Sequence, residues 1–395
     1  MRINNFNGLW YYTWVFREKL EELRLNNLSR AIRDRASFQG PVIRMDGREL
    51  INFASNDYLG LANHPDVRDS AKESLDTFGF GSGASRLLGG GTALHRNLEE
   101  TVARFKGTEA ALVLSSGYSA NTGIIPTLAG EGDLLLSDER NHASIVDGCR
   151  LSSAETLVYR HGEVAHLEEL IASSSLSAGH RYVLVTDTVF SMDGDMAPLY
   201  KLREICLKHG ALLYLDDAHG TGVLGGGKGA LAHFDILPEP WIIQMGTFSK
   251  ALGSYGAFIA CSREVVDWIT NTSRSLIFST ALPSCVAAAS SKAIEVVENT
   301  PELLQKLWDN RNLAFALLKG KGYDTGESET PIIPLKMKSI EDALHLSQRL
   351  YEEGIYVPAI RPPTVKEPRL RITVTAAHAK EHIRTLVETL EEIQG

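Results

Sequence analysis

The sequence has few cysteines, and their spacing gives no sign of a metal centre or a disulfide framework. The four cysteines are Cys149, Cys206, Cys261 and Cys285, and no two of them form a CxxC pair. This wide spacing argues against paired disulfides and against a thiolate zinc site. It fits a reducing compartment, so we expect a cytoplasmic protein.

Excess positive charge is also missing. The chain has 40 Lys and Arg residues against 49 Asp and Glu residues, which gives a formal net charge of -9 at pH 7. Proteins that bind nucleic acids need clustered positive charge to displace counterions from the phosphate backbone. We therefore expect a small-molecule ligand and no nucleic-acid partner.

No segment is apolar for long enough to span a bilayer. The aromatic stretch LWYYTWVF, residues 9–16, runs directly into the charged segment REKLEELR. It is too short for a transmembrane helix, and it lacks the basic start and small-residue cleavage site of a signal peptide. We interpret it as the aromatic anchor of a first helix and expect no membrane partner.

Short apolar runs alternate with helix-like segments through the first two thirds of the chain. Because the runs are nearly continuously apolar, they are typical of strands covered on both faces. The helix-like stretch LYKLREICLKHG ends at Gly210, in the position of a C-cap. This alternation predicts an α/β domain with a mainly parallel sheet. The predicted strands are residues 111–116, 133–138, 155–159, 181–187, 211–217, 241–246 and 257–261.

After Pro283 the pattern changes to long helix-like segments with strands near PIIPLKM and RLRITV. This predicts a smaller α+β unit, and no internal repeat or low-complexity linker interrupts the chain. We expect three parts: residues 1–55 as an N-terminal helix and strand segment packing with the small domain, 56–290 as the large domain, and 291–395 as the small C-terminal domain.

Polar side chains follow five of the predicted strands. They lie at residues 116–118, 141–144, 187–195, 216–220 and 247–250. In an open α/β sheet, ligands bind beyond the carboxyl ends of the strands. The sequence therefore predicts a ligand site at this edge.

Each cluster also has a purely structural interpretation. Asp216 can cap a helix, His219 can be a satisfied core histidine, and Lys250 can be a surface lysine. The glycine-rich run GFGSGASRLLGGG can be a plain loop. However, a lysine among small residues at a strand end is well placed to form an imine, provided that a carboxylate such as Asp216 pairs with a pyridinium nitrogen.

Eight motifs carry a family resemblance. They are NFASNDYLGL, FGSGASRLLGG, SSGYSANTG, NHASIVDG, DTVFSMDGD, LDDAHGTG, TFSKALGSYG and RLRIT. Together and in this order they resemble the α-oxoamine synthases, enzymes of fold type I that depend on pyridoxal 5′-phosphate. The resemblance implies a large, mainly parallel α/β sheet domain with a smaller α+β C-terminal domain. It also implies the decarboxylating condensation of an amino acid with an acyl thioester.

The resemblance implies roles at the cofactor. Lys250 would carry the cofactor as an imine and then remove the Cα proton of the amino acid, Asp216 would keep the ring nitrogen protonated, and His142 would stack on the ring. Because a base must be neutral, the pKa of Lys250 should be lowered by burial and by the nearby cationic cofactor. The other cofactor contacts implied are Gly117, Tyr118, Ser191, His219, Thr247, Ser249 and, from a neighbouring subunit, Thr280.

The resemblance also implies a substrate site and a substrate pair. Arg371 would bind the substrate carboxylate through its guanidinium fork, a task that suits this planar group. Arg33, Asn56, His142 and Thr364 would contact substrate as well. The segments GIYVPAIRPPTV and RLRITVTAAH resemble the branch that joins L-alanine to a pimeloyl thioester, of coenzyme A or an acyl carrier protein, in biotin biosynthesis. The segment PPTVKEPRLR is shorter than usual for the family. The alternative is the branch that joins glycine to acetyl-CoA, or another branch.

A homodimer with shared active sites is implied too, and two other classes of protein stay open. A metal-dependent hydrolase can use Asp216, Asp217 and His219 as ligands, although adjacent strand residues point to opposite faces of a sheet. A catalytically silent paralogue acting as a binding subunit is disfavoured, because the lysine and its partners are all present.

Overall fold

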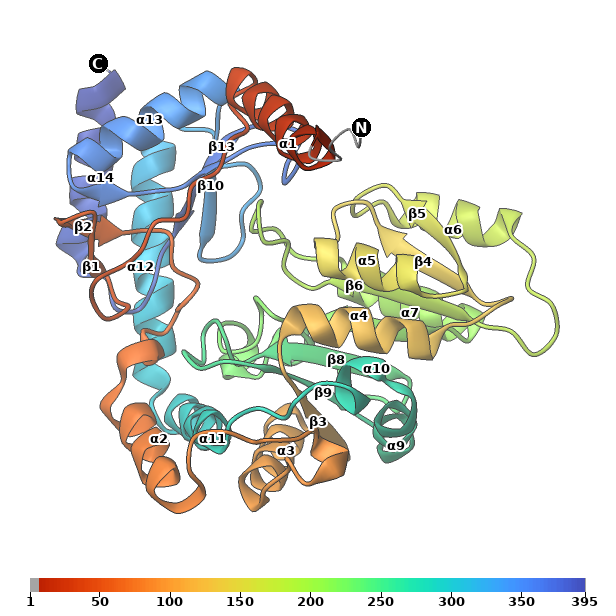
Figure 1. Ribbon diagram of the computed structural model, residues 1–395. Helices are drawn as coiled ribbons and strands as arrows, with labels where there is room; N and C mark the ends of the chain where they lie inside the picture. Colours follow the sequence, from red (N-terminus) through yellow and green to blue (C-terminus); the bar gives the residue numbers. More distant parts are fainter. Residues whose placement is uncertain (1–6, 395) are drawn as a thin grey trace, which may run out of the picture.

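The largest element of the fold is a seven-stranded sheet in the order β3-β9-β8-β7-β6-β4-β5, within a computed structural model that describes residues 7–394 (Figure 1). β9 is antiparallel to both of its neighbours, whereas the other neighbouring pairs are parallel. The prediction of a mainly parallel sheet is therefore confirmed. The strands are β3 (Ala110–Leu114), β4 (Leu134–Asp138), β5 (Glu155–Tyr159), β6 (Tyr182–Asp187), β7 (Leu212–Asp216), β8 (Ile242–Thr247) and β9 (Ala257–Cys261).

Helices cover both faces of this sheet, and alternate residues of each strand enter different cores. In β7, Leu213 and Leu215 belong to one buried cluster and Tyr214 to the other. α4 (Gly117–Leu128), α5 (Ala143–Leu151), α9 (Arg263–Thr272) and α10 (Arg274–Ile277) cover the face of Tyr214. The other face packs against α2 (Pro65–Phe78), α3 (Ala93–Lys106), α6 (Val164–Ser173), α7 (Leu199–His209), α8 (Ala230–His233) and α11 (Ser284–Asn299).

β5 departs from the expectation that every strand is covered on both faces. It is the edge strand of the sheet, and its Val158 side chain is exposed. An apolar run alone does not distinguish an edge strand from a central one, because both pack against a helix on at least one side.

The C-terminal part contains a small antiparallel sheet in the order β10-β13-β12. Its strands are β10 (Ile332–Lys336), β12 (Ala359–Ile360) and β13 (Arg369–Thr373), and its helices are α12 (Pro301–Gly320), α13 (Ile340–Glu352) and α14 (Lys380–Gln394). A third sheet joins β1 (Val42–Met45) and β2 (Arg48–Asn52) to β11 (Ile355–Tyr356). The N-terminal and C-terminal segments therefore share a sheet, while the predicted domain boundaries stay a prediction.

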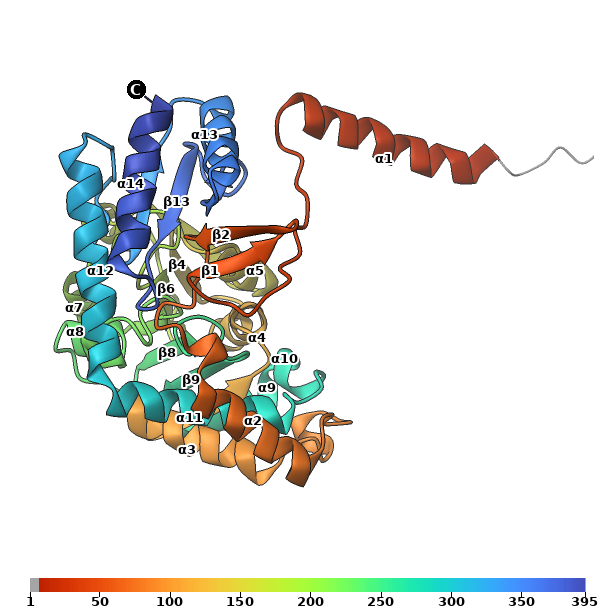
Figure 2. The same ribbon diagram turned by 90° about the vertical axis from the view of Figure 1, so that its left-hand side faces the viewer.

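The first helix, α1 (Asn7–Leu25), extends away from the body of the protein (Figure 2). The side chains of Trp14 and Phe16 are exposed, those of residues 9–12 lie outside the described ones, and the anchoring role of the aromatic stretch stays a prediction. No helix within residues 7–394 is both long and apolar enough to cross a membrane. Single-turn 3-10 helices lie at Leu61–Asn63, Arg86–Leu88 and Gly225–Gly227.

One loop, residues 188–197 after β6, connects the large sheet to the C-terminal part. It closes on itself through backbone bonds from Ala197 N to Thr188 O at 3.0 Å and from Gly194 N to Phe190 O at 2.8 Å. The Gly194 carbonyl also accepts a hydrogen bond from the Thr330 hydroxyl at 3.0 Å. This hairpin loop therefore lies where the two parts of the protein meet.

Candidate active site

Lys250 lies in a tight turn directly after β8. The turn closes through a hydrogen bond from Gly253 N to Lys250 O at 2.9 Å, and Gly253 has a φ of +60°. A Cβ atom at Gly253 would lie 2.2 Å from the Ala62 backbone nitrogen, so a side chain does not fit there. Burial lowers the pKa of Lys250 to about 8, although the charges of Asp216 and Asp187 oppose the shift. The amine can therefore lose its proton near neutral pH.

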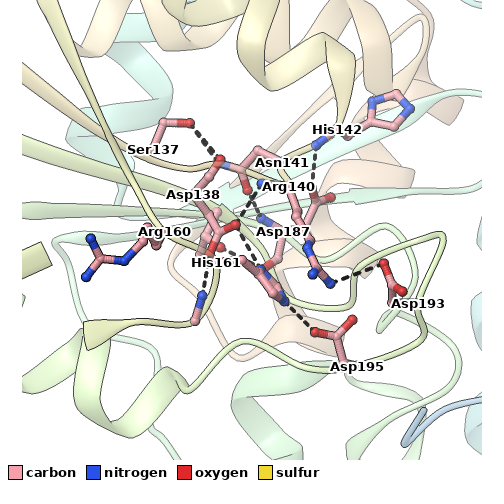
Figure 3. A network of polar contacts seen from close by, with 12 residues as sticks. Ser137, Asp138, Arg140, Asn141, His142, Arg160, His161, Asp187, Asp193 and Asp195 are labelled. Carbon is pink, nitrogen blue, oxygen red and sulfur yellow. Dashed lines mark hydrogen bonds and ion pairs between the residues drawn. The ribbon is translucent and has the colours of Figure 1, made fainter. Parts of the chain in front are cut away.

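Two buried carboxylates end neighbouring strands beside this lysine. Asp216 ends β7, Asp187 ends β6, and the two are paired in the register of the sheet. Asp187 accepts the backbone N–H of His142 at 2.6 Å (Figure 3). Burial, followed by the charge of Asp216, raises the pKa of Asp187 well above its ordinary value. Asp187 therefore takes up a proton more readily than an exposed carboxyl group does.

A hydrogen-bonded chain joins Asp216 to His142 through Asn121 of α4. Tyr214 donates its hydroxyl to Asn121 Oδ1 at 2.7 Å, and Asn121 Nδ2 donates to Asp216 Oδ2 at 2.7 Å and to Ser144 Oγ at 2.8 Å. Ser144 Oγ lies 2.7 Å from His142 Nδ1. Because the Ser144 backbone N–H donates to Nδ1 at 3.2 Å, Nδ1 is an acceptor, and a neutral His142 carries its proton on Nε2.

Burial keeps His142 neutral, because desolvation lowers its pKa even though Asp216 opposes the shift. Sequence reasoning missed Asn121. The available signal was its position four residues after Gly117, which places both on one side of the same helix.

His219 is held by a tyrosine from the N-terminal half of the chain. The Tyr58 hydroxyl lies 2.7 Å from His219 Nδ1, and both residues are buried. Burial, with the positive charges of Lys250 and Arg371, lowers the pKa of His219 well below its ordinary value. His219 is therefore a neutral hydrogen-bonding group at this site, and Tyr58 is a second residue that sequence reasoning missed.

Arg371 of β13 brings a buried positive charge to the same place. Its Nε donates to the Ser191 carbonyl at 2.6 Å, and its Nη1 donates to the Thr373 hydroxyl at 2.7 Å. Its Nη2 is buried and has no hydrogen-bond partner among the described residues. A buried guanidinium nitrogen without a partner is costly, and a carboxylate oxygen would satisfy it. The free donor is thus Nη2, while Ser191 contributes its backbone carbonyl.

Gly117 and Tyr118 are the first two residues of α4. Ser116 caps this helix by accepting the Ser119 N–H at 3.1 Å. A Cβ atom at Gly117 would lie 3.8 Å from Met245 Cε, so the start of α4 lies against the end of β8. The first N–H groups of a helix favour anions, which suits a phosphate group.

The predicted phosphate contacts Thr247 and Ser249 are engaged with their own turn. Thr247 Oγ1 donates to the Gly256 carbonyl at 2.7 Å and accepts the Ser249 N–H at 3.1 Å. Both hydroxyls thus help to shape the turn that carries Lys250, and their role as phosphate ligands stays a prediction.

The remaining predicted residues lie further out. Arg33 is exposed and stacks on the Tyr351 ring at 4.6 Å, and Thr364 is exposed in a loop. Thr280 is exposed and forms a β-bridge with Ser85. Their roles stay predictions.

Asn56 is nearer the centre of the site. It is half-buried, and its Oδ1 lies 3.5 Å from the Tyr58 hydroxyl. Through Tyr58 it is linked to His219.

The donor set fits pyridoxal 5′-phosphate better than a metal ion. Asp217 points to the opposite face of the sheet from Asp216, where its Oδ2 pairs with the buried Lys106 ammonium at 2.9 Å. The two carboxylates therefore do not share a metal site. A lysine that can be neutral, a buried carboxylate, a helix N-terminus and the unpartnered nitrogen of Arg371 match an anionic aldehyde cofactor and an amino-acid carboxylate.

Comparisons with known proteins agree with this geometry. Residues 48–390 match the family model "Aminotransferase class I and II". The chain is 50% identical over 94% of its length to a putative 8-amino-7-oxononanoate synthase from Thermodesulfovibrio yellowstonii, of which it covers 95%. It is 48% identical over 95% of its length to 8-amino-7-oxononanoate synthase from Geobacter sulfurreducens, of which it covers 96%.

Two solved structures are similar in fold. Serine palmitoyltransferase from S. paucimobilis, with bound PLP and myriocin, has a TM-score of 0.90 at 30% identity, covering 95% of this chain and 96% of that one. The 8-amino-7-oxononanoate synthase from Francisella tularensis has a TM-score of 0.76 at 27% identity, covering 87% of this chain and 98% of that one. The predicted fold type is confirmed by these similarities.

Proposed function

The chain belongs to the class I and II aminotransferase family, and on this basis we propose that it joins L-alanine to a pimeloyl thioester, with loss of carbon dioxide, to give 8-amino-7-oxononanoate. This is a step of biotin biosynthesis, and the cofactor is pyridoxal 5′-phosphate. The observation that carries the proposal is the placement of three groups: buried Asp216 ends β7, Lys250 follows the neighbouring strand β8, and buried Arg371, whose charge acts on Lys250, has an unpartnered Nη2. That arrangement places a base, a partner for a ring nitrogen and a carboxylate-binding group in one site.

Bound at this site, the cofactor supplies an electron sink for the negative charge that develops at the Cα of the amino acid. Lys250 would hold the cofactor, and Asp216 would hold the proton of its ring nitrogen. Asn121 keeps Asp216 oriented by donating to its Oδ2 at 2.7 Å. The N-terminus of α4, beginning at Gly117, would receive the phosphate.

The substrate side of the reaction depends on three groups of this chain. Arg371 would bind the carboxylate of L-alanine through Nη2, its free donor. Neutral Lys250 would then remove the Cα proton, which its pKa of about 8 allows near neutral pH. His142, with its proton on Nε2, would donate a hydrogen bond toward the reacting carboxyl or carbonyl oxygen.

The test is a comparison of substrate pairs with enzyme loaded with pyridoxal 5′-phosphate. We expect the highest kcat/KM with L-alanine and pimeloyl-CoA or pimeloyl-acyl carrier protein. One methyl group in an apolar pocket discriminates by about 1 to 3 kcal/mol, so glycine can bind but reacts poorly. A kcat/KM with glycine and acetyl-CoA that equals or exceeds the alanine value would replace this proposal with the alternative branch.

A second candidate is the condensation of L-serine with a long-chain acyl thioester. It is favoured by the TM-score of 0.90 to serine palmitoyltransferase, against 0.76 to a solved 8-amino-7-oxononanoate synthase. A TM-score reports the arrangement of the backbone, whereas identity reports the side chains that select the substrate. The 50% identity to the putative 8-amino-7-oxononanoate synthase from Thermodesulfovibrio yellowstonii therefore favours L-alanine as the substrate. L-serine with palmitoyl-CoA is the third pair in the same assay.

We also propose a homodimer in which Thr280 reaches the neighbouring cofactor. An apolar surface supports this proposal, because Phe80, Leu88 and Phe278 are exposed on the two segments joined by the Ser85–Thr280 bridge. Size-exclusion chromatography with light scattering should give twice the chain mass. A monomer with full activity at assay concentration would contradict the proposal.

A further inference from the structure

His161 lies between two carboxylates outside the cofactor site (Figure 3). Its Nδ1 is 2.9 Å from Oδ1 of Asp138, the last residue of β4, and its Nε2 is 2.7 Å from Oδ2 of Asp195 in the hairpin loop 188–197. The ring also packs edge-on against Phe190 of that loop, with 4.4 Å between centroids. His161 therefore connects the end of a central strand to the loop.

The geometry requires His161 to be a cation. Carboxylates only accept hydrogen bonds, so each of the two ring nitrogens must carry a proton to donate one. Burial would lower the pKa of His161, but the hydrogen bonds and charges of Asp138 and Asp195 overcome it and raise the pKa to about 9. At neutral pH the ring is therefore an imidazolium held by two acids.

The two acids differ in how they are anchored. Asp138 is fixed by the N–H groups of Arg140 at 2.8 Å and Gly162 at 3.0 Å. Asp195 depends on His161, because its other oxygen, Oδ1, is buried without a partner in the part of the chain that the structure describes. Loss of the charge on His161 would thus leave the Asp195 carboxylate, whose side chain is only 16% exposed, without its positively charged partner.

The loop that His161 holds also holds the substrate-binding arginine. Its Ser191 carbonyl accepts Nε of Arg371 at 2.6 Å. Its Asp193 pairs with Arg369, which lies two residues from Arg371 on β13, and with Arg140 at 3.4 Å. Because the loop closes on itself through backbone hydrogen bonds, its displacement at Asp195 would be transmitted to Ser191.

We propose that His161 is a positioning residue that, as a cation, holds the loop 188–197 against the sheet and so aims Arg371 at the substrate carboxylate. The inference rests on the proposed function for the identity of the amino acid. The role of His161 in holding the loop does not depend on which amino acid is the substrate. The role of His161 and the choice of amino acid can therefore be tested separately.

The pH dependence has a defined sign. The charged groups that face His161 are Asp138 from β4 and Asp195 from the loop, and both favour its protonation. A pKa raised from 6.5 to about 9 means that its stabilising contribution is complete below pH 6.5 and is lost as pH rises through about 9.

The first test separates substrate binding from chemistry. In enzyme loaded with cofactor, His161→Gln should raise KM for L-alanine about tenfold with kcat changed no more than about twofold. The variant disturbs the orientation of Arg371 but removes no reacting group. His345→Gln, at an exposed histidine on α13, is the matched control and should leave both constants unchanged. A KM no higher than that of the control, or a fall in kcat as large as the rise in KM, would overturn the proposal.

The second test needs no substrate, so it stands even if the chain prefers another amino acid. The Tm difference between wild type and His161→Gln should be largest at and below about pH 6.5 and should disappear as pH rises through about 9. Asp195→Asn offers an amide N–H to Nε2 and lets the ring be neutral, so NMR of the labelled imidazole should show its titration moved to lower pH. A wild-type His161 that titrates below pH 6.5 would overturn the proposal that its cation holds the loop 188–197.

Discussion

The centre of the site and its rim are held in different ways. The sheet-end cluster, Asn121, His142, Asp187, Asp216 and Lys250, sits on strand ends and helix starts and is joined by short hydrogen bonds or charge coupling. The rim, residues 26–41 and 361–368, carries Arg33 and Thr364 on irregular backbone, and both side chains are exposed. The comparison teaches that the buried polar cluster is fixed by regular structure, whereas Arg33 and Thr364 lie on loops that leave their side chains exposed.

The largest effect should come from the cluster's lysine. Lys250→Ala should lower kcat at least about 1,000-fold, because it removes both the cofactor attachment and the base. Some cofactor should remain bound through the phosphate and ring contacts, as equilibrium dialysis can measure. Lys228→Ala, at an exposed lysine of the neighbouring loop, is the control.

Borohydride reduction of the wild type should attach the cofactor to the peptide containing Lys250. If mass spectrometry finds the label on another lysine, Lys250 is not the residue that carries the cofactor.

The next effect should come from the arginine that faces the cluster. Arg371→Lys keeps a positive charge, but an ammonium cannot hold the Ser191 carbonyl and the Thr373 hydroxyl and still present a donor in the place of Nη2. KM for L-alanine should therefore rise about 30-fold with a smaller change in kcat. Arg384→Lys, on the exposed surface of α14, should change neither constant. An unchanged KM in Arg371→Lys would mean that the carboxylate binds elsewhere.

A smaller effect should follow from the buried amide. Asn121→Ala removes one hydrogen-bond partner from each of Asp216, Ser144 and Tyr214, which should lower the free energy of unfolding by about 2 kcal/mol and weaken cofactor binding. Urea unfolding and a cofactor titration measure the two quantities. Thr122→Ala, at its half-buried neighbour on α4 whose hydroxyl bonds, among the described residues, only to the Tyr118 carbonyl, should have little effect on either. Equal behaviour of the two variants would remove Asn121 from the cluster.

The smallest effect should come from the rim. Thr364 is exposed, so Thr364→Ala should change kcat/KM for the acyl thioester by no more than about twofold. A tenfold loss would show that the loop folds over bound substrate, and it would erase the contrast between centre and rim.

The same contrast explains what the sequence could predict. Apolar runs mark the strands, and parallel strands bring their carboxyl ends to one edge, so Lys250 and Asp216 could be placed together from sequence. Asn121 could not be placed in this way, because its three partners lie on other elements. A polar residue within a helix gives no sequence signal of the side chains that it contacts. The contacts of His161 could not be predicted for the same reason, since Asp138 and Asp195 reach it from separate segments.

Arg371 illustrates an intermediate case. Its motif predicts an arginine that binds a carboxylate, yet only packing determines which nitrogen remains free. The exposed Val158 of β5 is similar, because strand order, and hence the edge, follows from tertiary pairing.

The adjacent carboxylates at the end of β7 have one further consequence. Asp216 bonds to Asn121 on one side of the sheet, while Asp217 pairs with the Lys106 ammonium on the other side. A shift of β7 by a single residue would exchange the two faces, sending the wrong acid to each. Insertions or deletions within this strand should therefore be far less tolerated in evolution than substitutions of its apolar residues.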